Sequence, residues 1–143
     1  MSATSLQTVI RVKQFQVKKA QRELSEIKVS REKEQGALDH LEEKKDSAMN
    51  DSVRIMRTSA GDLQTSRAFI QSLSRQIQRQ EDRIDEIKKQ EDDKREELIE
   101  KKKVQEMVKN LDVKRKEVAE KEKEKKAQKV IDMLAQRLKL GFQ

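Results

Sequence analysis

A regular spacing of mostly apolar residues runs through the first 57 positions and limits what this chain can fold into. Steps of four and three alternate along it, through Leu6, Ile10, Lys13, Val17, Ala20, Leu24, Ile27, Arg31, Glu34, Leu38, Leu41, Lys45, Ala48, Ser52 and Ile55. A period of 3.5 residues keeps one stripe against a partner helix when the two helices wind into a left-handed coiled coil. The spacing therefore predicts a long helix over about residues 5–57 that packs on another helix.

A second stripe follows after a short interruption. It reads Leu63, Ser66, Ile70, Leu73, Ile77, Gln80, Ile84, Ile87, Glu91, Lys94 and Leu98, and after a phase slip it continues as Val104, Val108, Leu111, Arg115 and Val118. Between the stripes, Gly61 can adopt the left-handed conformation that ends a helix, and Asp62 can cap the next helix. We therefore expect a turn at about residues 58–62 and a second helix over about residues 63–140.

Two apolar stripes joined by a short turn favour a single antiparallel hairpin that covers residues 1–143. With the turn centred near residues 59 and 60, Leu6 lies level with residues near 113, and Arg31 and Glu34 lie level with the segment 85–91. Residues beyond about 114 then extend past the first helix by about 25 residues, or about 40 Å at 1.5 Å per residue. Polar seam residues such as Arg31 and Glu34 commonly fix the register of a coiled coil at a cost in stability.

Composition supports an all-α chain with a thin core. Charged residues make up 43% of the sequence and hydrophobic residues 33%, with no Pro and three Gly, and the mean hydropathy is -1.05. Disorder is the alternative at this hydropathy, but the apolar residues are periodic and the net charge of +7 is modest for 143 residues. The predicted fold is a long two-helix antiparallel coiled-coil hairpin whose C-terminal helix projects beyond the N-terminal one.

Charge is distributed unevenly along the chain. Residues 1–57 carry 12 basic and 9 acidic side chains, residues 58–100 carry 8 and 11, and residues 101–143 carry 14 and 7. A hairpin brings the two termini together, so the sequence predicts a strongly basic end. Such an end attracts an acidic cavity or phosphates.

The residue inventory argues against catalysis. There is one histidine, His40, no cysteine and no glycine-rich phosphate loop, and a two-helix hairpin provides no concave pocket. We expect no enzyme activity, no cofactor and no metal site. Nucleic-acid binding is weighed because the isoelectric point is about 9.6, but the basic segment 114–129 has acids interleaved and no stacking aromatics. We therefore expect a protein partner and no nucleic acid.

Two apolar surfaces lie outside the predicted seam. Phe69 stands one position before the seam residue Ile70, in a second stripe that also contains Leu73, Gln76 and Gln80. On the first helix, Met49, Val53 and Met56 also lie off the seam, at about the same level. At the other end, Val130, Ile131, Leu134 and Leu138 recur at helical spacing where the chain offers no partner helix. We predict one docking surface at each end.

The order and spacing of two elements resemble those of the FliJ family of the bacterial flagellar type III export apparatus. The first element is Phe69, Ile70, Gln71, Leu73 and Ile77, and the closing element is Lys129, Asp132, Ala135, Gln136 and Arg137. The resemblance covers nearly the whole chain. It departs from the family pattern on the first helix, where no tyrosines are present, so that the corresponding surface is assigned only loosely to Leu38, Leu41 and Lys45.

This resemblance implies a coiled-coil stalk that binds the hexameric export ATPase, contacts the export gate protein FlhA and takes part in handling export chaperones. It implies a cytoplasmic protein that is peripherally associated with the inner-membrane export apparatus. The implied gate-contacting residues are Phe69, Leu73, Gln76 and Gln80. The residues expected to contact the ATPase ring are Arg11, Lys13, Val130, Ile131, Leu134, Arg137 and Leu138.

Three other functions stay open at this point. The nearest is the equivalent stalk of a virulence type III secretion system, which has the same architecture. The others are a basic coiled coil that binds nucleic acid and a structural rod that assembles through its stripes, although the short turn at Gly61 argues against the rod.

Overall fold

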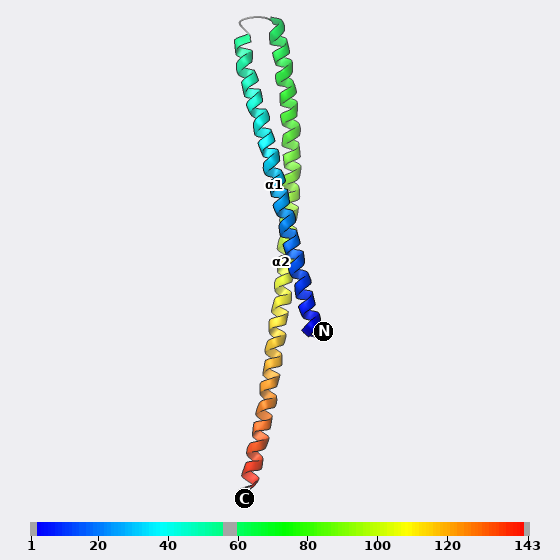
Figure 1. The fold of residues 1–143 in the computed structure, drawn as a ribbon, viewed down its shortest axis with the longest axis vertical. Coiled ribbons are helices and arrows are strands. Elements are labelled where there is room, and N and C mark those ends of the chain that lie inside the picture. Colours follow the sequence, from blue (N-terminus) through cyan, green and yellow to red (C-terminus); the bar gives the residue numbers. More distant parts are fainter. Residues whose placement is uncertain (1–2, 56–59, 142–143) are drawn as a thin grey trace. The chain divides into compact units, whose positions relative to one another are not determined.

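The computed structural model describes residues 3–55 and 60–141, and all of them lie in two α-helices. Helix α1 spans Ala3–Ile55 and helix α2 spans Ala60–Gly141. The two helices pack against each other (Figure 1). The prediction of an all-helical, two-helix coiled-coil hairpin is confirmed.

Helix α2 begins earlier than the sequence predicted. Ala60 is its first residue, so Gly61 and Asp62 lie in the first helical turn, and Gly61 has no positive φ. The hydroxyl of Thr65 donates a hydrogen bond to the carbonyl oxygen of Gly61 at 3.2 Å, as in a regular helical turn. The prediction that Gly61 ends a helix is therefore wrong. Asp62 places a carboxylate near the positive end of the α2 dipole. Thr58 and Ser59, also assigned to the turn, lie outside the described residues.

The chain divides into two compact units. Unit 2 comprises Lys18–Ile99, and its α1 and α2 segments run antiparallel. Its buried apolar residues all occupy predicted seam positions: Ala20, Leu24, Leu38, Ala48, Leu73 and Ile84. The other described seam side chains of this unit are buried or half-buried. The predicted seam of unit 2 is thus confirmed.

Unit 1 comprises Met1–Val17 and Glu100–Gln143. On α1, Leu6 and Val17 are buried, with exposed fractions of 2% and 6%. On α2, the half-buried positions of this unit are Lys101, Val104, Gln105, Val108 and Asp112.

The stripe predicted after the phase slip is only partly observed, because Val104 and Val108 are half-buried but Leu111 and Val118 are exposed. Spacings of four and three lead from Lys101 to Gln105, Val108 and Asp112, so α2 keeps its heptad phase and presents polar side chains to α1. Leu111, which the slip placed in the stripe, is 45% exposed. The position of α1 determines which face of α2 is covered. The apolar residues of α2, in contrast, shift gradually to another side of that helix.

The last part of α2 is not covered by α1 within unit 1. Every residue from 113 to 141 is exposed, although the helix continues to Gly141. Figure 1 shows this part of α2 continuing past the N-terminal end of α1. The predicted projection of the second helix is confirmed.

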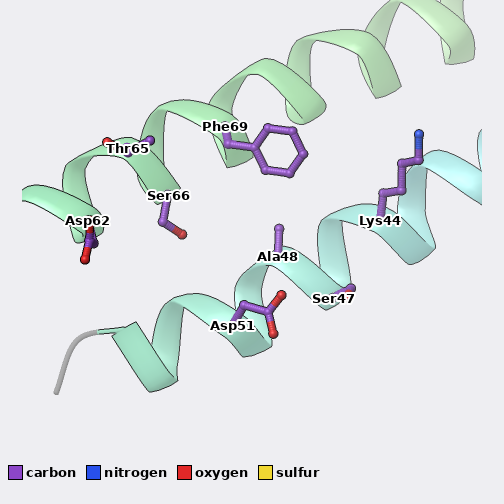
Figure 2. A pocket seen from close by; sticks show the side chains of 8 residues that line it. All are labelled: Lys44, Ser47, Ala48, Asp51, Asp62, Thr65, Ser66 and Phe69. Atoms are coloured by element: carbon purple, nitrogen blue, oxygen red, sulfur yellow. The ribbon is translucent and has the colours of Figure 1, made fainter. Parts of the chain in front are cut away.

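Small seam residues mark the part of unit 2 where α1 ends and α2 begins. Ala48 and Ser52 on α1 and Ser66 on α2 are buried or half-buried, but their short side chains do not fill the space between the helices. A groove opens there, with the ring of Phe69 beside it (Figure 2). The helices remain paired there, but the side chains between them are too small to fill the seam.

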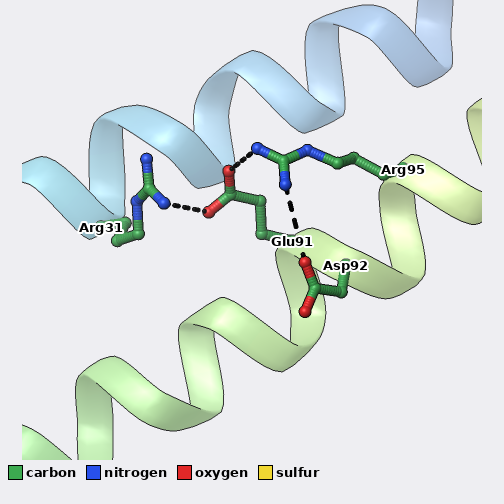
Figure 3. A network of polar contacts seen from close by, with 4 residues as sticks. All are labelled: Arg31, Glu91, Asp92 and Arg95. Carbon is green, nitrogen blue, oxygen red and sulfur yellow. Dashed lines mark hydrogen bonds and ion pairs between the residues drawn. The ribbon is translucent and has the colours of Figure 1, made fainter.

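A buried carboxylate lies in the seam of unit 2. Glu91 on α2 is 1% exposed. One of its oxygens pairs with Nη1 of Arg31 on α1 at 3.1 Å, and the other accepts a hydrogen bond from Nη2 of Arg95 at 2.8 Å (Figure 3). Nη1 of Arg95 also reaches Asp92 at 3.7 Å. The carboxylate is therefore buried with a cation on each side, which limits its desolvation cost.

A second polar contact joins the helices nearby. Nε2 of Gln80 donates to the backbone oxygen of Glu34 at 2.9 Å and to its carboxylate at 2.6 Å, and Arg83 lies 3.7 Å from the same side chain. Arg31 lies level with Glu91, and Glu34 lies level with Gln80 and Arg83. The Arg31 contact falls in the segment 85–91 expected from the sequence, whereas Glu34 contacts Gln80 and Arg83, which precede that segment.

Glu23, Lys94 and Glu97 form a third polar contact at the edge of the seam. The Lys94 ammonium pairs with Glu23 of α1 and, at 2.9 Å, with Glu97 of α2. The hydrogen bond from Lys94 lowers the pKa of Glu23, and the hydrogen bonds to Glu23 and then Glu97 raise the pKa of Lys94. The contribution of Glu23 to stability is thus present near neutral pH and is lost as the pH falls through its lowered pKa.

The buried Glu91 generates a prediction about register. Arg31→Leu leaves the buried carboxylate with one cation fewer, and we expect a loss of about 1–3 kcal/mol in the free energy of unfolding. Arg31→Leu combined with Glu91→Leu removes both charges, and we expect stability equal to or above that of the native chain. An apolar seam also accepts a shift of one heptad, which displaces the helices by about 10 Å.

Urea unfolding followed by circular dichroism measures the stability change. Spin labels on cysteines introduced at positions 35 and 88 report the register, because Gln35 and Lys88 line one groove beside Arg31 and the chain has no cysteine of its own. Arg79→Leu, at an exposed position of α2, is the control and should change stability by less than about 0.5 kcal/mol. A double variant with one unchanged label distance would contradict the register role.

The exposed glycine in the middle of α1 generates a second prediction. A Cβ added at Gly36 meets no atom within 4 Å. Gly36→Ala should therefore raise the free energy of unfolding by about 0.5–1 kcal/mol, because alanine loses less backbone freedom on entering a helix. Gly141→Ala also adds a methyl group in open space, but at the last residue of α2 it should have little effect. Equal melting temperatures for native chain and Gly36→Ala would refute this.

Candidate interaction surfaces

The groove of unit 2 is the first candidate surface. It has a volume of about 590 Å³. Its walls come from both helices: Lys44, Ser47, Ala48 and Asp51 of α1, and Asp62, Thr65, Ser66 and Phe69 of α2. Figure 2 shows these side chains around the gap between the two helices.

The groove has an apolar middle and a polar rim. The Phe69 ring is 54% exposed and lies across the gap from the methyl group of Ala48, which is 8% exposed. Lys44 lies at the end of the groove next to Phe69, and Asp62 lies at the other end. Asp51 faces Ser66 between them. An apolar side chain entering the groove would contact Phe69 and Ala48 and would have carboxylates about one helical turn away.

The structure places the four residues proposed for gate contact in different environments. Phe69 and Gln76 are exposed. Leu73 is 3% exposed and belongs to the seam, and Gln80 is half-buried and bonded to Glu34. Only Phe69 and Gln76 are therefore open to a partner.

On α1, the sequence pointed to residues away from the groove. Met49 and Val53 are exposed but do not line it, and Met56 lies outside the described residues. The residues assigned through the family resemblance, Leu38, Leu41 and Lys45, are buried or half-buried in the seam. The α1 side of the groove is instead mostly polar.

Sequence reasoning missed most of the groove residues. Lys44, Ser47 and Asp51 look like ordinary solvated positions, because only the partner helix shows which exposed residues face the same gap. A signal was nevertheless present. The seam changes from leucine and isoleucine to Ala48, Ser52 and Ser66 at this level, and small seam residues leave space between helices.

The end of α2 in unit 1 is the second candidate surface. Four predicted contact residues are all more than half exposed: Val130 at 56%, Ile131 at 57%, Leu134 at 53% and Leu138 at 63%. Met133 and Leu140 add exposed fractions of 57% and 71%. We call this set the apolar tip.

The predicted basic contacts of the same surface do not join the apolar tip as one cluster. Arg137 is exposed beside the tip, but Arg11 is exposed and Lys13 half-buried on α1, where α1 is paired with α2. Pairing on α2 ends near Asp112, and the 18 residues from there to Val130 span about 27 Å. A partner that contacts both groups must therefore reach along the helix.

Comparison with models of protein families decides which family the chain matches. The model described as Flagellar FliJ protein matches residues 1–140. The chain belongs to the FliJ family. Comparisons with curated proteins and with solved structures give no match. Membership in the FliJ family makes the chain an export-related flagellar protein.

The two units of this FliJ-family chain differ in charge. Unit 1 carries 16 basic and 8 acidic side chains, and unit 2 carries 18 and 19, which together account for the 34 and 27 of the chain. Unit 1 is therefore strongly basic and unit 2 nearly neutral. The apolar tip belongs to the basic unit.

Other kinds of site are not evident in residues 3–55 and 60–141 of the FliJ-family chain. No group of three or more potential ligands in these ranges is placed to hold a metal ion. Neither helix, over the same ranges, has a segment long and apolar enough to cross a membrane. His40 is exposed, as expected.

Proposed function

We propose that this chain is a non-enzymatic stalk of the flagellar protein export apparatus. Unit 1 binds the ring of the export ATPase, and the surface around Phe69 in unit 2 contacts the export gate protein FlhA. The chain acts in the cytoplasm at the inner-membrane export apparatus and takes part in handling export chaperones.

The observation that carries this proposal is the apolar tip on a helix that no other part of unit 1 covers. Six large apolar side chains are more than half exposed there. An uncovered apolar face of this kind marks a protein interaction site. The excess of basic side chains in unit 1 adds electrostatic attraction to an acidic socket.

The gate contact is supported by the exposed Phe69. Aromatic side chains are enriched among the residues that carry most of the binding energy of protein interfaces. Phe69 also belongs to the sequence element that resembles the FliJ family. The flagellar description of the matching family favours the flagellar apparatus over a virulence secretion system.

Co-elution of the chain with the export ATPase from the same genome tests the proposal directly. We expect a stable complex and a higher rate of ATP hydrolysis, because a stalk that seats in the ring favours its assembly. Absence of both effects with a folded, helical chain would refute the ring half of the proposal. Binding that survives deletion of residues 129–143 together with residues 1–12 would refute the proposed contact surface.

Substitutions in the apolar tip sharpen this test. Val130→Asp combined with Leu134→Asp should weaken ATPase binding at least tenfold, because it places two charges on the face that the ring covers. Val29→Asp combined with Ile99→Asp is the control, since it also adds two charges at positions that are 63% and 54% exposed, but in unit 2. Isothermal titration calorimetry gives the affinities, and circular dichroism checks that helicity is unchanged. Equal losses for both variants would argue against a specific contact at the tip.

The exposed part of the predicted gate surface gives a separate test. Phe69→Ala combined with Gln76→Ala should weaken binding of the cytosolic part of FlhA by about tenfold, which is typical for loss of a buried aromatic contact. Leu73 is left intact, because its removal would open a cavity in the seam. Val29→Ala, at a position 63% exposed in unit 2, should leave this affinity unchanged. Gate binding and motility that persist with Phe69→Ala and Gln76→Ala would contradict the assignment.

A further inference from the structure

We infer that the groove between α1 and α2 in unit 2 receives one large apolar side chain of the gate protein, next to a lysine or arginine of the same segment. The inference rests on the proposed gate contact and assigns its chemistry. It makes Ala48 the floor of the site and Asp51 a determinant of specificity. Neither residue was part of the surface expected from the sequence.

The size and lining of the groove define the apolar part of its occupant. A volume of about 590 Å³ falls in the range of clefts that hold small molecules, so one apolar side chain occupies only the part of the groove beside Phe69 and Ala48. The Phe69 ring and the Ala48 methyl group face each other across it. A leucine, methionine or phenylalanine side chain placed between them would contact both and would cover part of the exposed Phe69 ring.

Charge complementarity defines the second part of the occupant. Asp51 and Asp62 both line the groove, and Lys44 is the single basic residue in its walls. Lys44 lies at the Phe69 end, whereas the carboxylates lie at the other end. Ala48 and Asp51 are three residues apart, so their spacing along the helix is about 4.5 Å. A helical segment with a lysine or arginine three or four residues from its apolar side chain matches both features.

A second copy of the chain is the alternative occupant, because its unit 1 is basic and carries exposed apolar side chains near lysines. The two occupants differ in their effect on oligomeric state. The experiment therefore measures gate binding and self-association together.

Ala48→Leu tests the groove without touching its rim. The added isobutyl atoms occupy the groove floor and extend the apolar seam, so the melting temperature should stay equal or rise. Affinity for the cytosolic part of the export gate protein should fall at least tenfold, while co-elution with the export ATPase is retained. Asp51→Lys, at an exposed position, should also weaken gate binding and reduce its dependence on salt. Met49→Ala is the matched control, exposed on the same helix but outside the groove.

The outcomes separate this inference from the proposed function. If the native chain binds the gate protein, and both Ala48→Leu and Asp51→Lys bind it with an affinity within twofold of the native one, the groove assignment is overturned and the gate contact is kept. No gate binding by the native chain overturns both. If Ala48→Leu changes the sedimentation of the chain alone but does not lower its affinity for the gate protein, the groove belongs to a second copy of the chain. This result overturns the inference.

Discussion

The whole structure depends on one constraint, which is that each helix has a single partner. A 3.5-residue stripe is the only part of a helix surface that one partner can cover. Among the residues that the structure describes, eight apolar side chains become buried as a result, although the two helices are long. Exposed apolar residues are therefore unavoidable in this fold, and single ones such as Val29 need no functional explanation. Clusters are different, because the apolar tip and the surface around Phe69 collect exposed side chains that another protein can cover.

Because the apolar seam is thin, the polar contacts strongly affect which alignment of the two helices is stable. Glu91 stands at a seam position that leucine could occupy, and it is held there by Arg31 and Arg95. An ion pair of this kind adds little net stability compared with apolar packing. It does distinguish one alignment of the helices from alignments shifted by a heptad, which an apolar seam would accept almost equally well. Register matters here, because the groove beside Phe69 exists only when Ala48 lies opposite Phe69.

The candidate surfaces fall in different units and use different physical features. Unit 1 combines excess positive charge with an apolar face on an unpaired helix. Unit 2 is nearly neutral, and its surface is a groove where small seam residues leave space between paired helices. One surface thus arises because a helix extends beyond its partner, and the other because two helices pack incompletely. The proposed function assigns a different protein to each of these surfaces.

The sequence by itself determined the all-helical fold, the seam of unit 2, the level of Arg31 near Glu91, and the exposed end of α2. These follow from periodicity and helix propensity, which are local properties of the chain. It also identified Phe69 and four of the six residues of the apolar tip as exposed. The tertiary structure decided that Gly61 lies inside α2, and that polar Lys101, Gln105 and Asp112 are half-buried while Leu111 is exposed. It also decided that Lys44, Ser47 and Asp51, not Met49 and Val53, share a groove with Phe69. The physical reason is that a helix carries exposed residues on every side, and only the position of its partner determines which of them face one another.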